Sequence, residues 1–248
     1  MLAIIGGTGL TQLANLELAH REVVRTPYGE PSCALTFGKL KGQDVIFLAR
    51  HGYGHTIPPH QVNYRANIWA LHARQATHIV SVAAVGGIRA DLAPGTIAIP
   101  DQIIDYTHSR AHTFFDGTDQ PVTHIDFTWP YCEDLRQRFI RAAQKAGQKV
   151  VAGGVYGATQ GPRLESAAEI RRMEQDGADM VGMTGMPEAA LAKELGLCYA
   201  AIAVVANHAA GKGDSAQAIH FENLETVMQQ AMDRVRIILG NLVESDGG

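Results

Sequence analysis

The sequence lacks the features that mark several large classes of protein. Acidic residues outnumber Lys and Arg by 25 to 21, so the net charge of −4 offers no basic surface for nucleic acid. No apolar run approaches the ~20 residues that a membrane-spanning helix needs. Residues 1–5 have no basic segment of the kind that opens a signal peptide. These absences predict a cytoplasmic protein that has neither nucleic acid nor a membrane as a partner.

Cysteine is scarce, and no metal motif is evident. Cys33, Cys132 and Cys198 are far apart and form no C-x-x-C pair. We expect all three to be small buried hydrophobic residues in a reducing cytoplasm, without a redox or metal role. His51 and His55 have a spacing that would suit zinc on a helix, but the glycines and prolines around them disfavour a helix. No metal site is expected.

The residues that are present predict a large core and one α/β domain over residues 1–248, since 46% are hydrophobic. Apolar runs predict strands at 2–5, 34–40, 44–49, 78–83, 96–100, 151–158, 180–183 and 199–205, and helices at 61–75, 130–146, 166–176, 187–195 and 221–243. The first two strands after residue 30 read as an antiparallel hairpin, and the later ones as buried parallel strands. The expected fold is a three-layer αβα sandwich with a central mixed β-sheet. The irregular segment 101–129 is long enough to indicate a functional loop.

Glycine-rich segments follow four of the predicted strands. They are Ile5-Gly6-Gly7-Thr8-Gly9, Ala49-Arg50-His51-Gly52, Ala83-Ala84-Val85-Gly86-Gly87 and Gly182-Met183-Thr184-Gly185. Ligands of open α/β sheets bind beyond the carboxyl ends of strands. Hydroxyl groups, free backbone N–H groups and one arginine at such ends predict a site for a small oxyanion, and we expect phosphate.

Several of these residues have more than one interpretation. The segment from Gly6 to Gly9 resembles a dinucleotide-binding fingerprint, but Gln12 stands where that motif needs glycine. The side chain of Arg50 suits either a bidentate contact with phosphate or a structural ion pair. Glu165 lies before a predicted helix, where a carboxylate also complements the helix dipole. Asn207 ends a predicted strand, where it can cap a turn.

Three longer segments resemble a known family. Residues 61–71 (QVNYRANIWAL), 156–163 (YGATQGPR) and 183–188 (MTGMPE) closely resemble the trimeric purine nucleoside and methylthioadenosine phosphorylases. The resemblance runs over nearly the whole chain. It implies a nucleoside phosphorylase fold, a homotrimer, and a reaction that needs no cofactor because inorganic phosphate is a co-substrate.

The resemblance also implies roles for particular residues. The phosphate site would comprise Thr8, Arg50, His51, the backbone of Ala83 and Ala84, and Thr184. Met183 would lie under the ribose, with Ala209 in the substrate pocket, and His124 would reach the 5′ pocket of a neighbouring subunit. Either His220 or Phe221 would line that pocket. Asn207, Arg50 and His51 would be the catalytic residues.

Glu165 and Asn207 are the positions that decide which base fits. Adenine-specific members of the family carry serine and aspartate at these positions, whereas members that cleave 6-oxopurine nucleosides carry this Glu and Asn pair. An ionised Glu165 only accepts hydrogen bonds, so it suits N1–H of hypoxanthine and repels the bare N1 of adenine. We expect phosphorolysis of S-methyl-5′-thioinosine to hypoxanthine and 5-methylthioribose 1-phosphate.

Five alternatives remain open. The substrate is inosine or guanosine if His220 faces the 5′ group. An adenine-specific methylthioadenosine phosphorylase is opposed by Glu165 and Asn207. A hydrolytic nucleosidase, an oxidoreductase of the Rossmann type and a non-catalytic nucleoside sensor are the remaining three.

Overall fold

The structure is a computed structural model that describes residues 1–10, 13–118, 120–220 and 224–244. Its strands are β1 (Leu2–Gly6), β2 (Glu17–Glu22), β3 (Leu35–Leu40), β4 (Gln43–Ala49), β5 (His78–Gly87), β6 (Ile97–Ile99), β7 (Gln102–Asp105), β8 (Val151–Ala152), β9 (Val155–Ala158), β10 (Met180–Gly182) and β11 (Cys198–His208). Its α-helices are α1 (Tyr64–Ala73), α2 (Glu133–Lys145), α3 (Ala167–Gln175), α4 (Gly185–Glu194) and α5 (Leu224–Glu244). Two short 3₁₀-helices, η1 (Pro59–Gln61) and η2 (Gly213–Ser215), complete the elements.

The sheet is mixed, and it branches at β5. Its main path runs β2-β3-β4-β1-β5-β10-β9-β7, while β11 pairs with β5 and β6. Strand β1 pairs in parallel with β5 as far as Ser81, and β10 pairs antiparallel with Gly86 and Gly87. Between these pairings, residues 82–85 have no strand partner on that edge within the described part of the chain. This gap leaves backbone groups of β5 available to the site described below.

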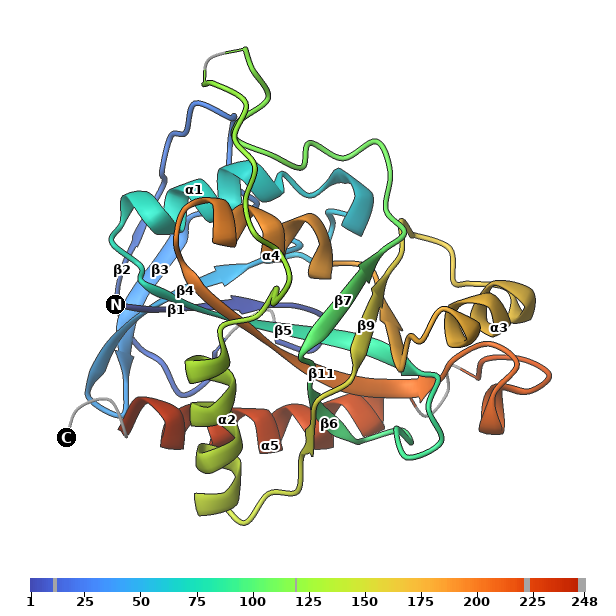
Figure 1. The fold of residues 1–248 in the computed structure, drawn as a ribbon. Coiled ribbons are helices and arrows are strands. Elements are labelled where there is room, and N and C mark those ends of the chain that lie inside the picture. The colour runs from blue at the N-terminus through green and yellow to red at the C-terminus, as the bar shows by residue number, and fades with distance from the viewer. Residues whose placement is uncertain (11–12, 119, 221–223, 245–248) are drawn as a thin grey trace.

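Helices cover both faces of the sheet (Figure 1). Helices α1 and α4 lie on one side of β5 and β11, and α2 and α5 lie on the other. Alternate residues of β5 enter different cores: Ile79 packs in the core that contains α1 and α4, and Val80 packs in the core that contains α2 and α5. A smaller third cluster packs α3 against Val181 of β10. The predicted three-layer αβα architecture is confirmed.

Local differences from the predicted elements have clear causes. The hairpin of β3 and β4 forms as expected. The predicted strand at 151–158 divides into β8 and β9, because Gly153 and Gly154 have φ of 109° and 128°. Strand β2 was missed because its residues are mostly exposed and show no apolar alternation. The segment 101–129 begins with β7 before it becomes irregular, and the predicted helix 221–243 is described from Leu224.

The cysteine prediction was wrong for two of the three residues. Cys132 precedes α2, Cys198 begins β11, and their sulfur atoms form a disulfide although 66 positions separate them in sequence. Packing of α2 beside β11 brings their Cα atoms within 5.1 Å, a proximity that sequence spacing does not reveal. Cys33 is the free cysteine, and its half-buried thiol donates to the carbonyl of Ala49.

Candidate active site

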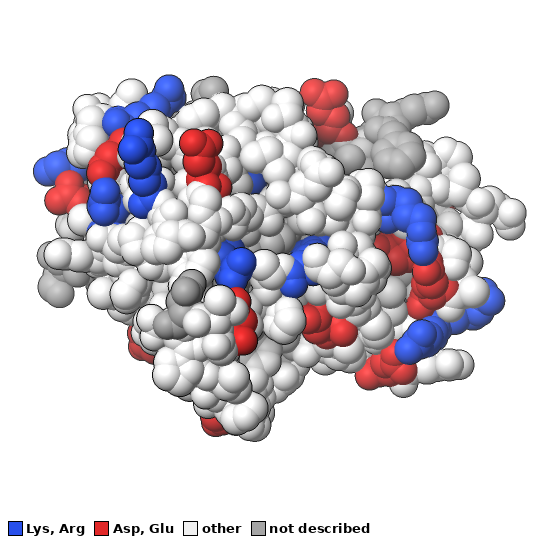
Figure 2. Space-filling view, turned by 90° about the horizontal axis from the view of Figure 1, so that it is seen from above, with Lys and Arg blue, Asp and Glu red and all other residues white. Residues whose placement is uncertain are grey.

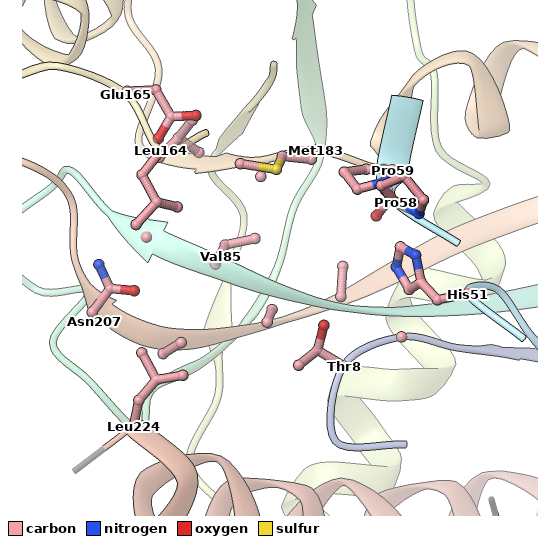
Figure 3. A pocket seen from close by; sticks show the side chains of 18 of the residues that line it. Thr8, His51, Pro58, Pro59, Val85, Leu164, Glu165, Met183, Asn207 and Leu224 are labelled. Carbon is pink, nitrogen blue, oxygen red and sulfur yellow. The ribbon is translucent and has the colours of Figure 1, made fainter. Parts of the chain in front are cut away.

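A cavity of about 360 Å³ opens where the ends of β1, β4, β5, β10 and β11 converge. Figure 3 shows Glu165 and Asn207 at one end of this cavity and His51 at the other, with Thr8 and Met183 on opposite walls between them. The predicted site residues in its lining are Thr8, Arg50, His51, Ala83, Ala84, Glu165, Met183, Thr184, Asn207 and Ala209. Segments distant in sequence therefore meet here as predicted, while the role of each residue depends on its contacts.

The first wall of the cavity is built by the loops after β1 and β4. These parallel strands are paired so that Gly6 lies opposite Ala49, and the N–H of Arg50 donates to the carbonyl of Gly6 at 2.9 Å. Both strands thus end at one level, with the exposed side chain of Thr8 beside the turn that carries His51. Gly7 is required here: a Cβ atom would lie 2.6 Å from the carbonyl oxygen of Val82 and 2.8 Å from Nη1 of Arg50.

Of the two interpretations of Arg50 that the sequence left open, the structural ion pair is present. Its side chain is buried and forms an ion pair with Glu188, with Nε 2.7 Å from Oε2 and Nη2 2.9 Å from Oε1. Nη2 also donates to Ser81 Oγ at 2.6 Å, and Nη1 donates to the carbonyl of Val82 at 3.0 Å. Since a guanidinium has five N–H groups, one hydrogen on Nη1 remains for a ligand. The structural ion pair is therefore the main role of Arg50, and at most a single hydrogen bond reaches the cavity.

His51 is neutral and has a defined tautomer. Burial and the adjacent positive charge of Arg50 lower the pKa of His51 to about 4. Its Nδ1 lies 2.8 Å from the carbonyl oxygen of Ile57. Because a carbonyl only accepts, Nδ1 carries the proton, and the other ring nitrogen, Nε2, is left as an acceptor.

Thr184, Ala83 and Ala84 also line the cavity. Thr184 is buried and precedes α4, yet its hydroxyl makes no capping hydrogen bond with that helix. Ala83 and Ala84 lie in the stretch of β5 that neither β1 nor β10 covers. Hydroxyl groups and the edge of a strand that has no partner there are suitable groups for holding an oxyanion.

The opposite end presents amide and carboxylate groups. Strand β11 has a bulge between Val205 and Asn207 where its register with β5 shifts, and such bulges redirect side chains. Asn207 donates one amide hydrogen to the carbonyl of His208 at 2.6 Å. Glu165 is half-buried, and Thr159 donates its hydroxyl to Oε1 of this carboxylate at 2.7 Å. The second amide hydrogen and Oδ1 of Asn207, and Oε2 of Glu165, are thus the groups left for a ligand.

Met183 forms the wall between the two ends (Figure 3). Gly161 permits this placement, since its φ is +62° and a Cβ atom there would lie 2.4 Å from the sulfur of Met183. Ala209 lines the cavity and is buried, and its N–H donates to the carbonyl of Gly87 at 2.8 Å. The side chain of Met183 therefore provides an apolar wall between the end with His51 and the end with Glu165 and Asn207.

Two predicted residues are absent from the lining of the cavity, and a third is not described. His124 is exposed and is absent from the lining, as is His220, while Phe221 lies outside the described residues. The structure instead brings in apolar residues that sequence reasoning missed: Leu164, Ile219 and Leu224, together with Ile57, Pro58 and Pro59. Ile219 immediately precedes His220 in the sequence.

Charge is dispersed over the face of the molecule seen in Figure 2. Figure 2 shows acidic and basic side chains intermingled on the face seen from above, with no broad patch of one sign. No group of three or more His, Cys, Asp or Glu side chains suitable for a metal ion occurs among the residues that the structure covers. Within the same residues, no helix is long and apolar enough to cross a bilayer.

Comparison with known proteins identifies the family. Residues 1–244 match the phosphorylase superfamily. The chain is 50% identical over 243 residues to a probable S-methyl-5′-thioinosine phosphorylase of Pseudomonas syringae pv. tomato, covering 98% of each chain. It is 46% identical over 243 residues to a 6-oxopurine nucleoside phosphorylase of Pyrococcus furiosus, covering 96% of this chain and 90% of the relative.

A solved structure with the same fold is that of methylthioadenosine phosphorylase from Schistosoma mansoni in complex with adenine. Its TM-score is 0.94 at 32% identity, over 99% of this chain and 91% of that one. The predicted resemblance is confirmed, and the chain belongs to the phosphorylase superfamily.

Proposed function

We propose that the protein catalyses phosphorolysis of a 6-oxopurine nucleoside, with S-methyl-5′-thioinosine as the preferred substrate. The observation that carries this proposal is the placement of Glu165 and Asn207 at the end of the cavity opposite His51 (Figure 3). A nucleoside that spans these ends places its base against the carboxylate and amide, and its sugar against Met183. Phosphate then occupies the cradle near Thr8 and His51.

The anion is held mainly by neutral groups. Thr8, Thr184 and the free edge of β5 supply hydroxyl and backbone donors, and Arg50 adds its one remaining N–H. His51 accepts the hydrogen of a P–OH group through Nε2. The reaction uses inorganic phosphate as co-substrate and needs no metal or organic cofactor.

The chemical step follows from this arrangement. A phosphate oxygen attacks C1′ as the C1′–N9 bond breaks, and the sugar passes through a state with oxocarbenium character. The negative phosphate stabilises this developing positive charge at close range. The purine leaves with the electron pair of the broken bond, and Asn207 stabilises the N7-protonated base by accepting from N7–H. Asn207 has no titrating proton, so the proton on N7 comes from water or from phosphate.

Base selection depends on Glu165 and Asn207. Oε2 of Glu165 accepts from N1–H of hypoxanthine, and the spare amide hydrogen of Asn207 donates to O6. Adenine reverses both groups, so its bare N1 would face a carboxylate. A buried polar mismatch of this kind discriminates by roughly 10⁴. The same argument opposes methylthioadenosine as the main substrate.

The 5′ substituent distinguishes two candidate substrates. Ile219 and Leu224 line the cavity, whereas His220 is exposed outside it. We assign these two apolar side chains to the 5′ group, which favours methylthio over hydroxyl. Burial of a thiomethyl group contributes roughly 1–2 kcal/mol, so a preference of about tenfold over inosine is expected.

We further propose a cytoplasmic homotrimer in purine salvage. His124 is exposed in the single chain, as a residue that completes the site of a neighbouring subunit would be. Light scattering tests the trimer, and an active monomer would remove His124 from the site.

The deciding experiment compares initial rates with methylthioinosine, inosine and methylthioadenosine, each with and without phosphate. Phosphate-dependent release of hypoxanthine, fastest from methylthioinosine, is the expected result. Release of base without phosphate would identify a nucleosidase. Faster turnover of inosine would assign the 5′ pocket to a hydroxyl group, and binding without release would identify a sensor.

A further inference from the structure

Glu188 is a fully buried carboxylate that accepts hydrogen bonds from Arg50, Ser81 and Tyr199. It lies in α4 and is not part of the cavity lining among the described residues. Oε1 accepts from the hydroxyl groups of Ser81 and Tyr199 at 2.7 and 2.9 Å, and both oxygens accept from Arg50. Burial alone would raise the pKa of Glu188, but Arg50 and the two hydroxyl groups outweigh it and lower that pKa. The carboxylate is therefore ionised and held by three partners from three different strands or strand ends.

The position of this carboxylate determines what Arg50 offers to a ligand. Nε and one hydrogen of Nη2 point at Glu188, and the second hydrogen of Nη2 points at Ser81. Since the guanidinium is rigid and planar, these contacts fix its rotation. The remaining donor, Nη1, is then held between the carbonyl of Val82 and Gly7, at the edge of the cavity.

We propose that Glu188, held by Ser81 and Tyr199, is a positioning residue that aims a single N–H of Arg50 at phosphate. This inference rests on the proposed phosphate site and adds residues that touch no substrate. It makes the anion site depend on a buried network that joins α4, β5 and β11.

Glu188 could also act by neutralising the charge of Arg50, and the two roles predict opposite effects of its removal on phosphate affinity. If Glu188 only neutralised the charge of Arg50, then removing its charge would leave Arg50 with a free positive charge and tighten phosphate binding. If Glu188 positions Arg50, its loss frees the guanidinium to rotate, and phosphate binding weakens. The sign of the change therefore separates positioning from neutralisation.

The chain contains a matched control for this test. Tyr131 and Tyr199 are both buried, and their rings stack at 6.0 Å with 16° between the planes. The hydroxyl of Tyr199 bonds Glu188, whereas the hydroxyl of Tyr131 has no hydrogen-bond partner in the described structure. Tyr199→Phe and Tyr131→Phe thus remove the same atom from the same cluster, and only the former touches Glu188.

The experiment measures the Kd of inorganic phosphate by calorimetry and the KM of phosphate and of nucleoside by initial rates. Tyr199→Phe and Ser81→Ala should each raise the Kd and KM of phosphate about fivefold, with little change in the KM of nucleoside, because hydrogen bonds to charged groups are the stronger ones. Glu188→Gln should raise both phosphate constants at least about tenfold. Tyr131→Phe should leave all of them unchanged.

Several outcomes would overturn the proposal. One is tighter or unchanged phosphate binding in folded Glu188→Gln, and another is an equal change in Tyr199→Phe and Tyr131→Phe. Circular dichroism checks folding, and if Glu188→Gln does not fold, the comparison of the two tyrosine variants decides. The wild-type protein separates this proposal from the proposed function: phosphate-dependent cleavage upholds that function whatever the variants show, and its absence refutes it.

Discussion

Thr159 donates its hydroxyl to Oε1 of Glu165 across 2.7 Å, so one oxygen of this carboxylate is engaged before a base arrives. Thr159 is buried, and its hydroxyl lies 3.3 Å from the carbonyl of Gly182 as a second, longer contact. The free oxygen of Glu165 is thereby held toward the cavity. Thr159 is thus expected to support base selection without touching the base.

Thr159→Val should lower kcat/KM for methylthioinosine about tenfold, because Glu165 loses a hydrogen bond to a charged group. The KM of phosphate should not change, since the anion binds at the other end. Thr159→Ser keeps the hydroxyl and should retain most activity. An equal loss in both variants, measured by initial rates, would mean that the methyl group matters and the hydrogen bond does not.

The double substitution Glu165→Ser with Asn207→Asp should shift preference from methylthioinosine toward methylthioadenosine. The new aspartate accepts from the N6 amino group or a protonated N7, and the new serine removes the carboxylate that opposes N1. Each single change should mainly lose hypoxanthine release, because half of the hydrogen-bond pattern stays wrong. Both residues touch one ring, so their effects should not be additive. A wild-type preference for methylthioadenosine would refute this account of the base site.

His51 makes stability depend on pH. Its pKa is lowered to about 4 in the folded protein, against roughly 6.5 for an unperturbed histidine, so the unfolded chain binds the extra proton first. The contribution of His51 to stability is complete above pH ~6.5 and is lost as the pH falls toward 4. His55, Arg50 and Glu188 are the other ionisable groups that influence this ring.

Thermal melts between pH 7.5 and 4.5 check this prediction. Wild-type protein should lose more in Tm over this range than His51→Gln, by roughly a few degrees, since glutamine does not titrate. Parallel curves for the two proteins would show that other groups cause the acid sensitivity.

The tautomer of His51 predicts a preference between anions. Nε2 accepts a hydrogen bond, so it suits a P–OH group, which phosphate retains at neutral pH and sulfate lacks. Sulfate should bind at least about tenfold more weakly than phosphate, since its oxygen would face a lone pair. His51→Gln provides an amide donor to both anions, so it should bring the Kd of sulfate closer to that of phosphate. Competition titrations measure the two Kd values, and equal binding of the two anions to the wild type would contradict the assigned tautomer.

The disulfide should add substantially to stability. It closes a loop between Cys132 and Cys198, which are 66 residues apart, and such a loop corresponds to about 4 kcal/mol in the chain-entropy description. Cys132→Ser should lower the free energy of unfolding by an amount of that order in urea titrations under oxidising conditions. Cys33→Ser, which breaks no disulfide, is the control. If dithiothreitol lowers the free energy of unfolding of the wild type no more than that of Cys132→Ser, the disulfide does not form in solution.

The sequence predicted what local patterns encode and missed what long-range packing decides. The predicted site at the strand ends followed from local patterns, namely glycines such as Gly7 and Gly185 and the apolar runs that precede them. A structural ion pair was one of two roles predicted for Arg50, but its partner was not predictable, because Glu188 is 138 positions away and looks like an ordinary helix-start residue. The disulfide was missed for the same reason.

Other features depend on local detail that no sequence pattern marks. Asn207 reaches the cavity through a bulge in β11, and no sequence pattern marks such a bulge. Ile219 lines the cavity and its neighbour His220 does not, while the alternative residue, Phe221, lies outside the described residues. The pairing of β2 with β3 was invisible because an exposed edge strand needs no apolar alternation.

The sheet branches at β5, and the proposed phosphate site and base site come mostly from different parts of the sequence. Most residues of the proposed phosphate site precede residue 90, and the residues proposed to contact the base follow residue 158. A lineage can therefore exchange its leaving group through changes in the later part of the gene while its nucleophile site stays intact. One fold can therefore evolve specificity for different nucleosides while its phosphate site stays unchanged.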